Sequence, residues 1–321
     1  MASEIISIGK INMDVVMHVQ RLPSKNEHIT TDAGHISFGG SASNFAMQSA
    51  RLGVPTGLIS CVGDDLYGQL ALKELTEAGV DVNQVLVLGN QPTGLFFLAE
   101  QPNGDRMVFT EPGANRLLEK HVLDDDTVAR ARVVHVAGGF PMMTMRTLET
   151  ATLNGMIFSI DPGRAAAELD FVQILPQTDL LFVNQDELKN YFNITPTERN
   201  LRTFAKTFPG IVVVKRGNAG AVATDGFEYC TSEVFEVKAV DTLGAGDAFA
   251  AGFVTAWTRS EDIEKALHVG NAVAALTITK RGAQQGQPSL KETAKLLKNN
   301  GISIDAILRT FGERTRKRKR R

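Results

Sequence analysis

"VDTLGAGDAFAAGF", residues 240–253, places one aspartate directly behind three small residues in a glycine-rich turn. The preceding run "SEVFEVKAV" (232–240) alternates apolar and polar residues, which predicts a strand. The run "DAFAAGFVTAW" (247–257) is mostly apolar and predicts a buried helix. The segment is therefore expected to form a strand, a tight turn and a helix, with a carboxylate at the entrance of the helix.

The small residues at this entrance suit a bound anion. Gly244, Ala245 and Gly246 leave backbone N–H groups uncovered at a helix N-terminus, where the helix dipole also attracts negative charge. Asp247 would then stand where an incoming hydroxyl group meets a bound phosphate. A tight turn in which Asp247 only caps the helix explains the same residues, and local physics favours the two interpretations about equally.

Composition indicates an ordinary globular chain. Its 321 residues are 43% hydrophobic and 22% charged, and this length suggests about two domains, although an α/β fold of this size is often one. The two cysteines, Cys61 and Cys230, have no pairing or metal spacing, which favours a reducing compartment. We find no signal peptide and no uncharged apolar run of the ~18 residues that a membrane helix needs. The expected location is the cytoplasm.

The charge of the chain is unevenly distributed. Residues 314–321, "RTRKRKRR", contain seven basic side chains, so the rest of a chain of net charge −2 carries −9. Residues 313–321 are predicted to be a disordered basic tail. Nucleic-acid binding through this tail is the alternative, but an acidic body is not typical of a dedicated DNA-binding domain.

Short apolar runs alternate with helical ones along the chain. Strands are predicted at 4–11, 56–63, 132–139, 156–163, 179–187 and 210–217, and helices such as 41–53 and 67–79 end in a glycine. Continuous apolar strands separated by helices predict a parallel, doubly wound sheet.

Two regions interrupt this alternation. Residues 14–40 and 93–113 contain strand-like pieces and turn signals without helices, so we expect a small β-sheet appendage from roughly 14–38 and 93–112. Ligands of an open parallel sheet bind beyond the carboxyl ends of its strands, where the polar strand-end residues gather. Two nucleotide motifs are excluded, because the chain has no P-loop sequence and Phe249 replaces the third glycine of G-x-G-x-x-G.

Several motifs together resemble one family. "DTLGAGDAFAAGF" resembles the carboxy-terminal signature of the ribokinase, or phosphofructokinase-B (PfkB), family of carbohydrate and nucleoside kinases. "FGGSASNFAMQSARLG" resembles its amino-terminal glycine signature, and "GKINMDVV" its opening strand with a substrate-binding aspartate. "GDDLYG", "PGAN", "NQDE", "KRGNAG" and "TKRGAQ" follow in the family's order, and the similarity covers about residues 4–295. The resemblance implies a three-layer, ribokinase-like α/β sandwich over residues 1–312, with a mainly parallel sheet and the β-appendage as a lid.

The resemblance also implies roles for single residues. Asp247 corresponds to the catalytic base, and the amides of residues 244–247 to an anion hole. The substrate-binding positions are Asn12, Asp14, Gly39, Gly40, Asn44 and Asp247, and the nucleotide-binding positions are Asn184, Lys215, Gly217, Gly220, Gly244, Gly246 and Asn271. Glu187 would act on Mg²⁺ through water. Asp241 falls where some members place a monovalent-cation site, which would make K⁺ a further cofactor.

Plainer explanations exist for several of these residues. Asn12 and Asp14 alone would be a strand-end turn, and the paired glycines alone a turn that opens a helix. Asn184 and Glu187 are spaced as in a capping box. A helical asparagine such as Asn271 is often structural.

Departures from the family pattern bear on the substrate. Ser41 stands where ribokinases commonly have a lysine after the paired glycines, which leaves room beside C1 of the sugar ring. Arg106 and Arg164 could bind the carboxylate or phosphate of an acidic sugar, although such arginines often form surface ion pairs.

We therefore expect an ATP- and Mg²⁺-dependent kinase that phosphorylates a primary hydroxyl of ribose or a ribonucleoside, and a homodimer that pairs through the lid. The alternatives are a hexose, sugar-phosphate or 2-keto-3-deoxy sugar-acid kinase, and a non-catalytic regulatory or nucleic-acid-binding protein on the same fold.

Overall fold

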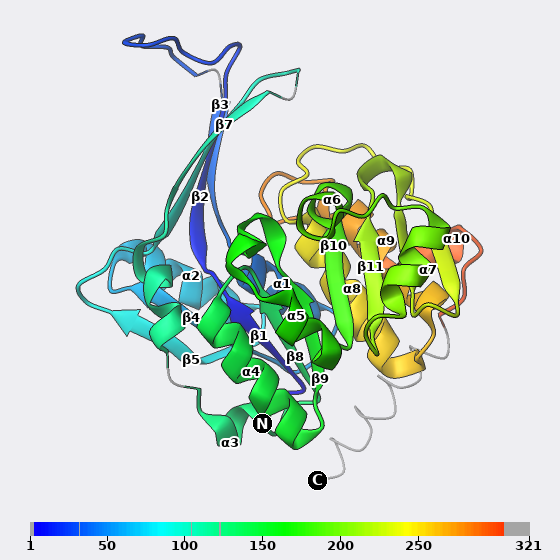
Figure 1. Ribbon diagram of the computed structural model, residues 1–321. Helices are drawn as coiled ribbons and strands as arrows, with labels where there is room; N and C mark the ends of the chain where they lie inside the picture. Colours follow the sequence, from blue (N-terminus) through cyan, green and yellow to red (C-terminus); the bar gives the residue numbers. More distant parts are fainter. Residues whose placement is uncertain (1–2, 32, 104, 122, 305–321) are drawn as a thin grey trace.

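A nine-stranded sheet forms the centre of the protein in the computed structural model, which describes residues 3–31, 33–103, 105–121 and 123–304 (Figure 1). The strand order is β13-β12-β11-β10-β9-β8-β1-β4-β5. Neighbouring strands are parallel except at β11–β12 and β12–β13. This confirms the expected doubly wound, mainly parallel sheet. The nine strands are β1 (Ile5–Gly9), β4 (Thr56–Gly63), β5 (Val80–Leu88), β8 (Val133–Ala137), β9 (Ile157–Asp161), β10 (Leu180–Asn184), β11 (Ile211–Lys215), β12 (Ala221–Thr224) and β13 (Tyr229–Ser232).

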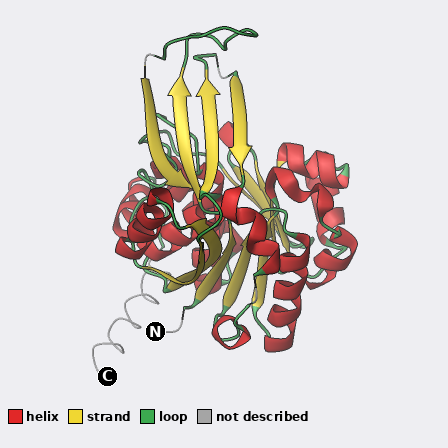
Figure 2. Ribbon diagram, turned by 90° about the vertical axis from the view of Figure 1, so that its left-hand side faces the viewer, coloured by secondary structure: helices red, strands yellow, loops and turns green. Residues whose placement is uncertain are grey.

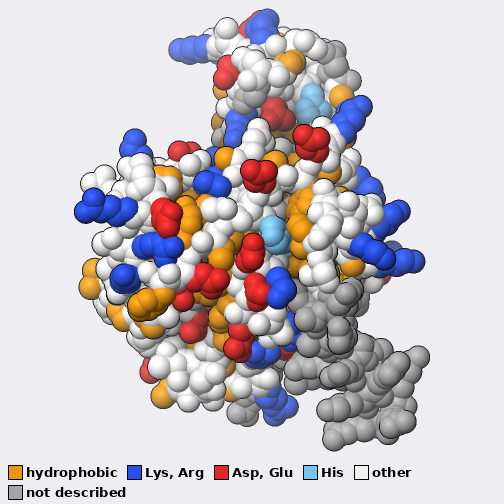
Figure 3. Space-filling model, turned by 90° about the vertical axis from the view of Figure 1, so that its right-hand side faces the viewer, with side chains coloured by type: hydrophobic (Ala, Val, Ile, Leu, Met, Phe, Trp, Pro, Cys, Tyr) orange, Lys and Arg blue, Asp and Glu red, His pale blue; other side chains and the backbone are white. Residues whose placement is uncertain are grey.

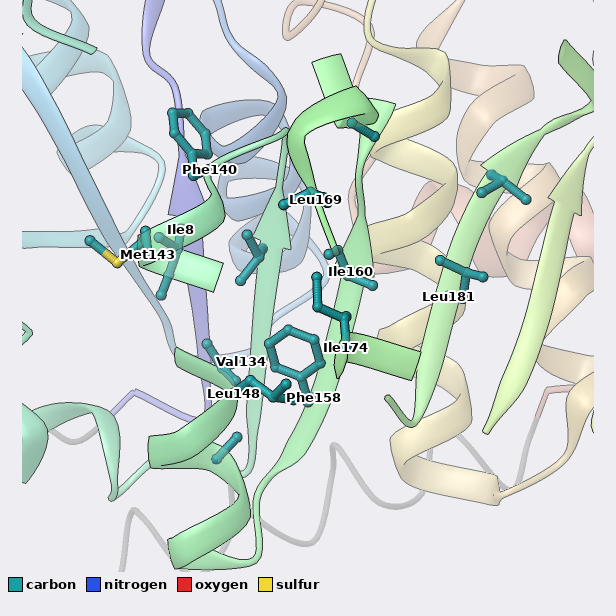
Figure 4. Packing of buried hydrophobic residues seen from close by; sticks show 14 of the residues in the cluster. Ile8, Val134, Phe140, Met143, Leu148, Phe158, Ile160, Leu169, Ile174 and Leu181 are labelled. Carbon is teal, nitrogen blue, oxygen red and sulfur yellow. The ribbon is translucent and has the colours of Figure 1, made fainter. Parts of the chain in front are cut away.

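Helices cover both faces of this sheet, so its inner strands are mostly apolar and buried (Figure 2). On β1, Ile6 and Ile8 enter one core and Ile5 the other, as the two-residue period of a strand requires. The first core lies under α4 (Pro141–Asn154), α5 (Phe171–Ile174), α6 (Gln185–Phe192) and α7 (Glu198–Ala205), and Figure 4 shows part of it. The second lies under α1 (Ser41–Arg51), α8 (Ala245–Ser260), α9 (Ile263–Thr277) and α10 (Leu290–Asn299). Further helical segments are α2 (Leu66–Glu77), α3 (Asp125–Val128) and the 3₁₀ helices η1 (Gly113–Lys120), η2 (Gly163–Glu168), η3 (Leu175–Gln177) and η4 (Gly217–Ala219).

A second sheet of four strands stands beyond the carboxyl ends of β1 and β4 (Figures 1 and 2). Its order is β3-β2-β6-β7, formed by β2 (Asn12–His18), β3 (Ala33–Gly39), β6 (Gly94–Glu100) and β7 (Arg106–Glu111). We call this sheet the lid. The strands β2 and β6 are parallel and the two outer pairs are antiparallel. Because only two residues separate β1 from β2, the lid is rooted directly at the edge where ligands of such sheets bind.

One expected strand is absent. Residues 233–239 carry the alternating pattern that predicted a strand, but they form no ladder after β13. The amide Nδ2 of Asn271 on α9 donates to the carbonyl oxygens of Ser232 and Glu233 at 3.0 and 3.2 Å. Phe235 packs into the second core. The alternation at this segment therefore reflects packing against helices, and the prediction of a strand at 232–240 was wrong.

The surface carries mixed charge. On the face shown in Figure 3, acidic side chains run down the middle and most lysines and arginines lie toward the margins. The basic tail at 313–321, and the end of the kinase domain at 312, lie outside the described residues. Within the described ranges, no helix is long and apolar enough to cross a membrane.

Candidate active site

The glycine-rich turn opens helix α8 as expected. Gly244 is the N-cap residue, with a left-handed φ of 75°, and an added Cβ would lie 2.7 Å from the carbonyl oxygen of Ala283. No side chain caps this helix, and Asp247 lies in its first turn, three residues after the N-cap residue. The interpretation of Asp247 as a capping residue was therefore wrong. The amide of Ala245 reaches the Thr242 carbonyl oxygen at 3.3 Å, whereas the next amides of this first turn lack intrahelical acceptors.

Asp247 is held from a distant part of the chain. The side-chain amide of Asn44 on α1 donates to Asp247 Oδ2 at 2.8 Å. Gln284 in turn donates to Asn44 Oδ1 at 3.1 Å, which fixes the orientation of the Asn44 amide. Burial raises the pKa of Asp247 to about 7, and the Asn44 hydrogen bond opposes this rise. Asp247 is thus an oriented carboxyl group whose pKa lies near neutrality, as suits a general base.

Asp14 is a second buried carboxyl group, and it comes from lid strand β2. Its side chain is 3% exposed, and burial, followed by the charges of Asp247 and Asp241, raises its pKa to about 8. A Cβ at Gly39, on the neighbouring strand β3, would lie 2.0 Å from Asp14 Oδ2. Glycine at position 39 therefore makes room for this carboxylate, which the idea of a simple glycine turn does not explain.

Asn12 lies at the root of the lid, inside strand β2 and not in a strand-end turn. Asn115 Nδ2 donates to Asn12 Oδ1 at 3.0 Å and to the Ile11 carbonyl oxygen at 2.9 Å. The Ile11 amide donates back to Asn115 Oδ1 at 3.2 Å. These bonds fix the junction between β1 and the lid, so the lid residues approach the glycine-rich turn from a defined direction.

A cavity of about 290 Å³ joins these groups. Its lining combines lid residues with the glycine-rich turn and with the ends of β1, β8 and β9. The lining residues are Lys10, Asn12, Asp14, Gly40, Ser41, Asn44, Phe96, Thr110, Ala137, Gly138, Pro162, Gly163, Arg164, Leu243, Gly244 and Asp247. The order of the sheet reverses between β1 and β8, because β4 and β5 follow on one side of β1 and β8 to β11 on the other. The cavity therefore lies at the topological switch point, where open α/β sheets bind ligands. We call it the acceptor cavity.

A second cavity, of about 330 Å³, lies on the other side of the same turn. It is mostly apolar, with Val234, Phe235, Val237, Phe249 and Ile278 in its lining. Its other lining residues include Lys215, Gly217, Gly220, Gly246 and Asn271, all of them positions that the family resemblance assigns to the nucleotide. We call it the donor cavity. Asn271 also donates to the backbone that forms the cavity wall, so it has a structural role there in addition to lining the cavity.

Charged residues meet at the carboxyl ends of β9, β10 and β11. Lys215 Nζ forms an ion pair with Asp161. Burial lowers the pKa of Lys215, but the charges of Asp161 and Glu187 outweigh burial, so this pKa is raised. Glu187 is 7% exposed, and burial and the Asp161 charge raise its pKa. Two carboxylates thus face one ammonium group. This excess of negative charge fits a divalent cation held through water and phosphate oxygens.

Asn184 and Glu187 do form a capping box at the start of α6. The Asn184 amide donates to Glu187 Oε2 at 2.8 Å, and the Glu187 amide donates to Asn184 Oδ1 at 2.9 Å. The box occupies one oxygen of each side chain and leaves Glu187 Oε1 for another partner. Within the described ranges, no group of three or more His, Cys, Asp or Glu side chains is arranged to hold a metal by itself.

Asp241 accepts a backbone hydrogen bond on each of its two carboxylate oxygens. Its carboxylate accepts from the Leu243 amide at 2.9 Å and from the Gly282 amide at 2.8 Å, and lies 3.6 Å from His35 Nε2 of the lid. These bonds fold the loop at 241–243 against 282. Asp241 therefore shapes the loop that precedes the glycine-rich turn, whether or not a cation binds there.

The two candidate arginines lie far apart in the structure. Arg164 is an exposed residue of the acceptor-cavity lining, close enough to Glu187 to lower its pKa. Arg106 begins β7 and pairs in register with Glu100, the last residue of β6, at the end of the lid away from its root. Because Leu95 and Glu111 mark the root, Arg106 does not line the cavity that Asp14 and Asp247 share.

Sequence reasoning missed four residues of this site: Lys10, Asn115, Asp161 and Gln284. Asp161 is the last residue of β9 and Lys10 follows β1, so their strand-end positions were a usable signal. Asn115 and Gln284 lie within the short motifs "PGAN" and "TKRGAQ", but their contacts with Asn12 and Asn44 span more than 100 residues. No local pattern reveals contacts at that separation.

Comparisons with known proteins agree with this geometry. Residues 2–290 match the family described as pfkB family carbohydrate kinase. An ATP-dependent ribose-1-phosphate kinase from Halopiger xanaduensis is 35% identical over 281 residues, 87% of this chain and 93% of that protein. A nucleoside kinase from Methanothermobacter thermautotrophicus is 26% identical, over 91% of this chain and 94% of that one. The solved structure of Arabidopsis thaliana ribokinase with ribose and ATP superposes with a TM-score of 0.84 at 27% identity, covering 93% of this chain and 99% of that chain. The ribokinase-like architecture is thereby confirmed, and the chain belongs to the pfkB family of carbohydrate kinases.

Proposed function

We propose that this protein transfers the γ-phosphate of ATP to a primary hydroxyl group of a ribose-type acceptor, either a ribose derivative or a ribonucleoside. One observation carries the proposal: the first turn of α8 is the wall between two cavities, with Asp247 on the acceptor side and Gly246 on the donor side. Phosphoryl transfer needs an acceptor hydroxyl, a base and the γ-phosphate in line, and this arrangement supplies a place for each.

The residues divide the work as follows. Asp14 and Asn12 offer oxygen atoms to the hydroxyl groups of the ring, and Asp247 takes the proton of the attacking hydroxyl. The new bond joins the sugar oxygen to the γ-phosphorus, and the bond to the β–γ bridging oxygen breaks, which leaves ADP. Amides at the N-terminus of α8 stabilise charge on the transferred group. Lys215 adds a positive charge next to Gly246, since its Nζ would lie 3.4 Å from a Cβ there.

Magnesium fits this site. Glu187 and Asp161 would hold the ion, in part through water, and the ion would neutralise the phosphate oxygens of ATP. Lys215 holds the side chain of Asp161 in place by its ion pair. For K⁺, the residues that would hold the ion are Asp241 and its neighbouring backbone.

The lid supports a homodimer. Ile36 and Phe109 lie on the lid face opposite to Asp14, because strand register places them in the alternate row. They are 64% and 58% exposed. Large apolar side chains exposed on a thin sheet suit a second copy of the same sheet. We also propose the cytoplasm as the compartment, in keeping with ATP as donor and with two free cysteines.

The decisive experiment replaces the base. Asp247→Asn keeps the size of the side chain, so both ligands should still bind while kcat falls roughly 10²–10⁴-fold, the usual contribution of general-base catalysis. ADP release would be followed with ribose, ribose 1-phosphate, adenosine, cytidine, fructose and 2-keto-3-deoxygluconate as acceptors. An unchanged kcat, or equal loss of binding, would assign Asp247 a structural role. Absence of turnover with every acceptor in the wild type would favour a regulatory protein on this fold.

A further inference from the structure

Lys10 is a charged residue of the acceptor cavity that the proposed chemistry does not use. It follows β1 directly, at the switch point of the sheet, and lines the cavity beside Gly138. Its Nζ lies 5.7 Å from the ring centroid of Phe140. Phe140 is 6% exposed and lies above Ile8 at the carboxyl end of the strands (Figure 4). The ammonium group of Lys10 thus lies over the Phe140 ring at the top of the core, and the residue lines the cavity.

The ammonium group of Lys10 has no carboxylate partner within 4.0 Å among the described residues. Burial lowers its pKa, and no neighbouring carboxylate raises it. The charges that act on Asp14 are Asp247 and Asp241, and the cation that acts on Asp247 is Lys215. Lys10 therefore does not serve to balance either acidic group of the cavity.

The other cation of the cavity differs from Lys10 in this respect. Arg164 is exposed and acts on Glu187, so part of its charge is already compensated by the protein. A partly buried ammonium group without a counter-charge is unfavourable, and closing a lid over it with a neutral ligand would add to that cost. An anionic group on the ligand would remove the cost and add a charge-assisted hydrogen bond.

We propose that Lys10 binds an anionic substituent of the acceptor sugar, so that the preferred acceptor carries a phosphate or carboxylate in addition to the hydroxyl that is phosphorylated. The inference rests on the proposed function, because it takes this cavity as the acceptor site. A phosphate ester of a ribose-type ring is the acceptor that combines this anion with a diol for Asp14. Lys10 is then the residue that separates such an acceptor from free ribose and from nucleosides.

Binding without ATP tests Lys10 separately from catalysis. Titration calorimetry would measure ribose 1-phosphate, ribose, adenosine and 2-keto-3-deoxygluconate with the wild type and with Lys10→Met, which keeps the length of the side chain. The wild type should bind ribose 1-phosphate at least 10-fold more tightly than ribose. Lys10→Met should weaken the affinity for ribose 1-phosphate by roughly 10- to 100-fold, the range of a hydrogen bond to a charged group. The affinity for ribose should change by less than about 3-fold.

Matched variants exclude other causes. Lys73→Met removes an equal charge from the exposed face of α2, where Lys73 pairs with Glu77, and should change neither ligand. Lys10→Arg should restore most of the affinity for ribose 1-phosphate. In the wild type, inorganic phosphate should compete with ribose 1-phosphate for binding, a measurement that needs no variant to fold.

The outcomes are distinct. Equal binding of ribose and ribose 1-phosphate by the wild type, or no loss in a folded Lys10→Met variant, would overturn the inference. A Lys10-dependent preference for the sugar acid would support it and identify the anion as a carboxylate. If the binding pattern holds but no acceptor is phosphorylated when MgATP is added, the proposed function fails while the role of Lys10 stands.

Discussion

The pH dependence of kcat/KM should report the burial of Asp247. Burial raises the pKa of this carboxyl group from 3.8 to about 7. A general base works only when ionised, so activity should be lost as the pH falls through 7. If Asp247 titrates independently of Asp14, about a tenth of it is ionised at pH 6 and about a hundredth at pH 5. An ordinary carboxyl group would leave the rate unchanged over the same range.

Asp14 should add a second step to the profile. Its pKa is raised to about 8, and its ionised form is the better acceptor for the hydroxyl groups of the ring. If both groups must be ionised, log(kcat/KM) rises with slope 2 below pH 7 and slope 1 between pH 7 and 8, and levels off above. Activity at pH 6 would then be about 10⁻³ of the plateau. Asp14→Asn should lower the plateau and leave a single step.

Two variants tell a protein group from titration of the nucleotide. Asn44→Ala removes the hydrogen bond that lowers the pKa of Asp247, so its step should move to higher pH. Asp161→Asn removes a charge that raises this pKa, so the step should move to lower pH. The assay follows ADP release from pH 5 to 9 with ribose or adenosine, which do not titrate there, at saturating MgATP. A single step near pH 4, or a step that Asn44→Ala leaves in place, would refute the assignment to a buried Asp247.

Three further outcomes follow from the geometry. Gly39→Ala places a Cβ 2.0 Å from Asp14 Oδ2 and should lower kcat/KM for the acceptor at least 10-fold, whereas Gly89→Ala, with open space around it, should have no effect in the same assay. Arg164→Ala should lower kcat/KM for acidic acceptors, whereas Arg106→Ala, at the far end of the lid, should leave this kcat/KM within about 2-fold of the wild type. The reverse result would mean that the lid bends far enough to bring its outer end to the cavity. Sedimentation at the working concentration should show a dimer. A charged residue in place of Ile36 or Phe109 on the exposed lid face should dissociate this dimer. A monomeric wild type would contradict the proposed pairing through the lid.

Six of the nine strands of the central sheet could be predicted because each of them is specified locally, whereas β5, β12 and β13 were not predicted. Runs such as 180–184 and 211–215 are apolar on both faces, and helices α1 and α2 begin and end close to the expected residues. The segment at 232–240 shows where this reasoning fails. Alternation reports which side chains are buried, but not whether a strand or a helix buries them. Here Asn271 takes two of the backbone carbonyl groups that a ladder would need.

The site was predictable where one short segment carries the chemistry, and not where distant side chains meet. The turn before α8 was visible because its glycines and Asp247 are consecutive. The bond between Asn44 and Asp247 joins residues 203 apart, and the pair of Lys215 and Asp161 joins residues 54 apart. Arg106 could not be separated from Arg164 by sequence either, since only strand register places Arg106 at the outer end of the lid.

The spacing within the turn explains why its signature is so short. Residues three apart lie on the same side of a helix, so Gly244 and Asp247 face the acceptor cavity while Ala245 and Gly246 face the donor cavity. A single helical turn can therefore present a base to one ligand and open backbone to the other, with no second element needed to align them. Larger side chains at 245 or 246 would fill the donor side without touching Asp247. Gly246→Val should accordingly raise KM for ATP much more than KM for the acceptor, and an equal rise in both would show that the turn does not separate the two ligands.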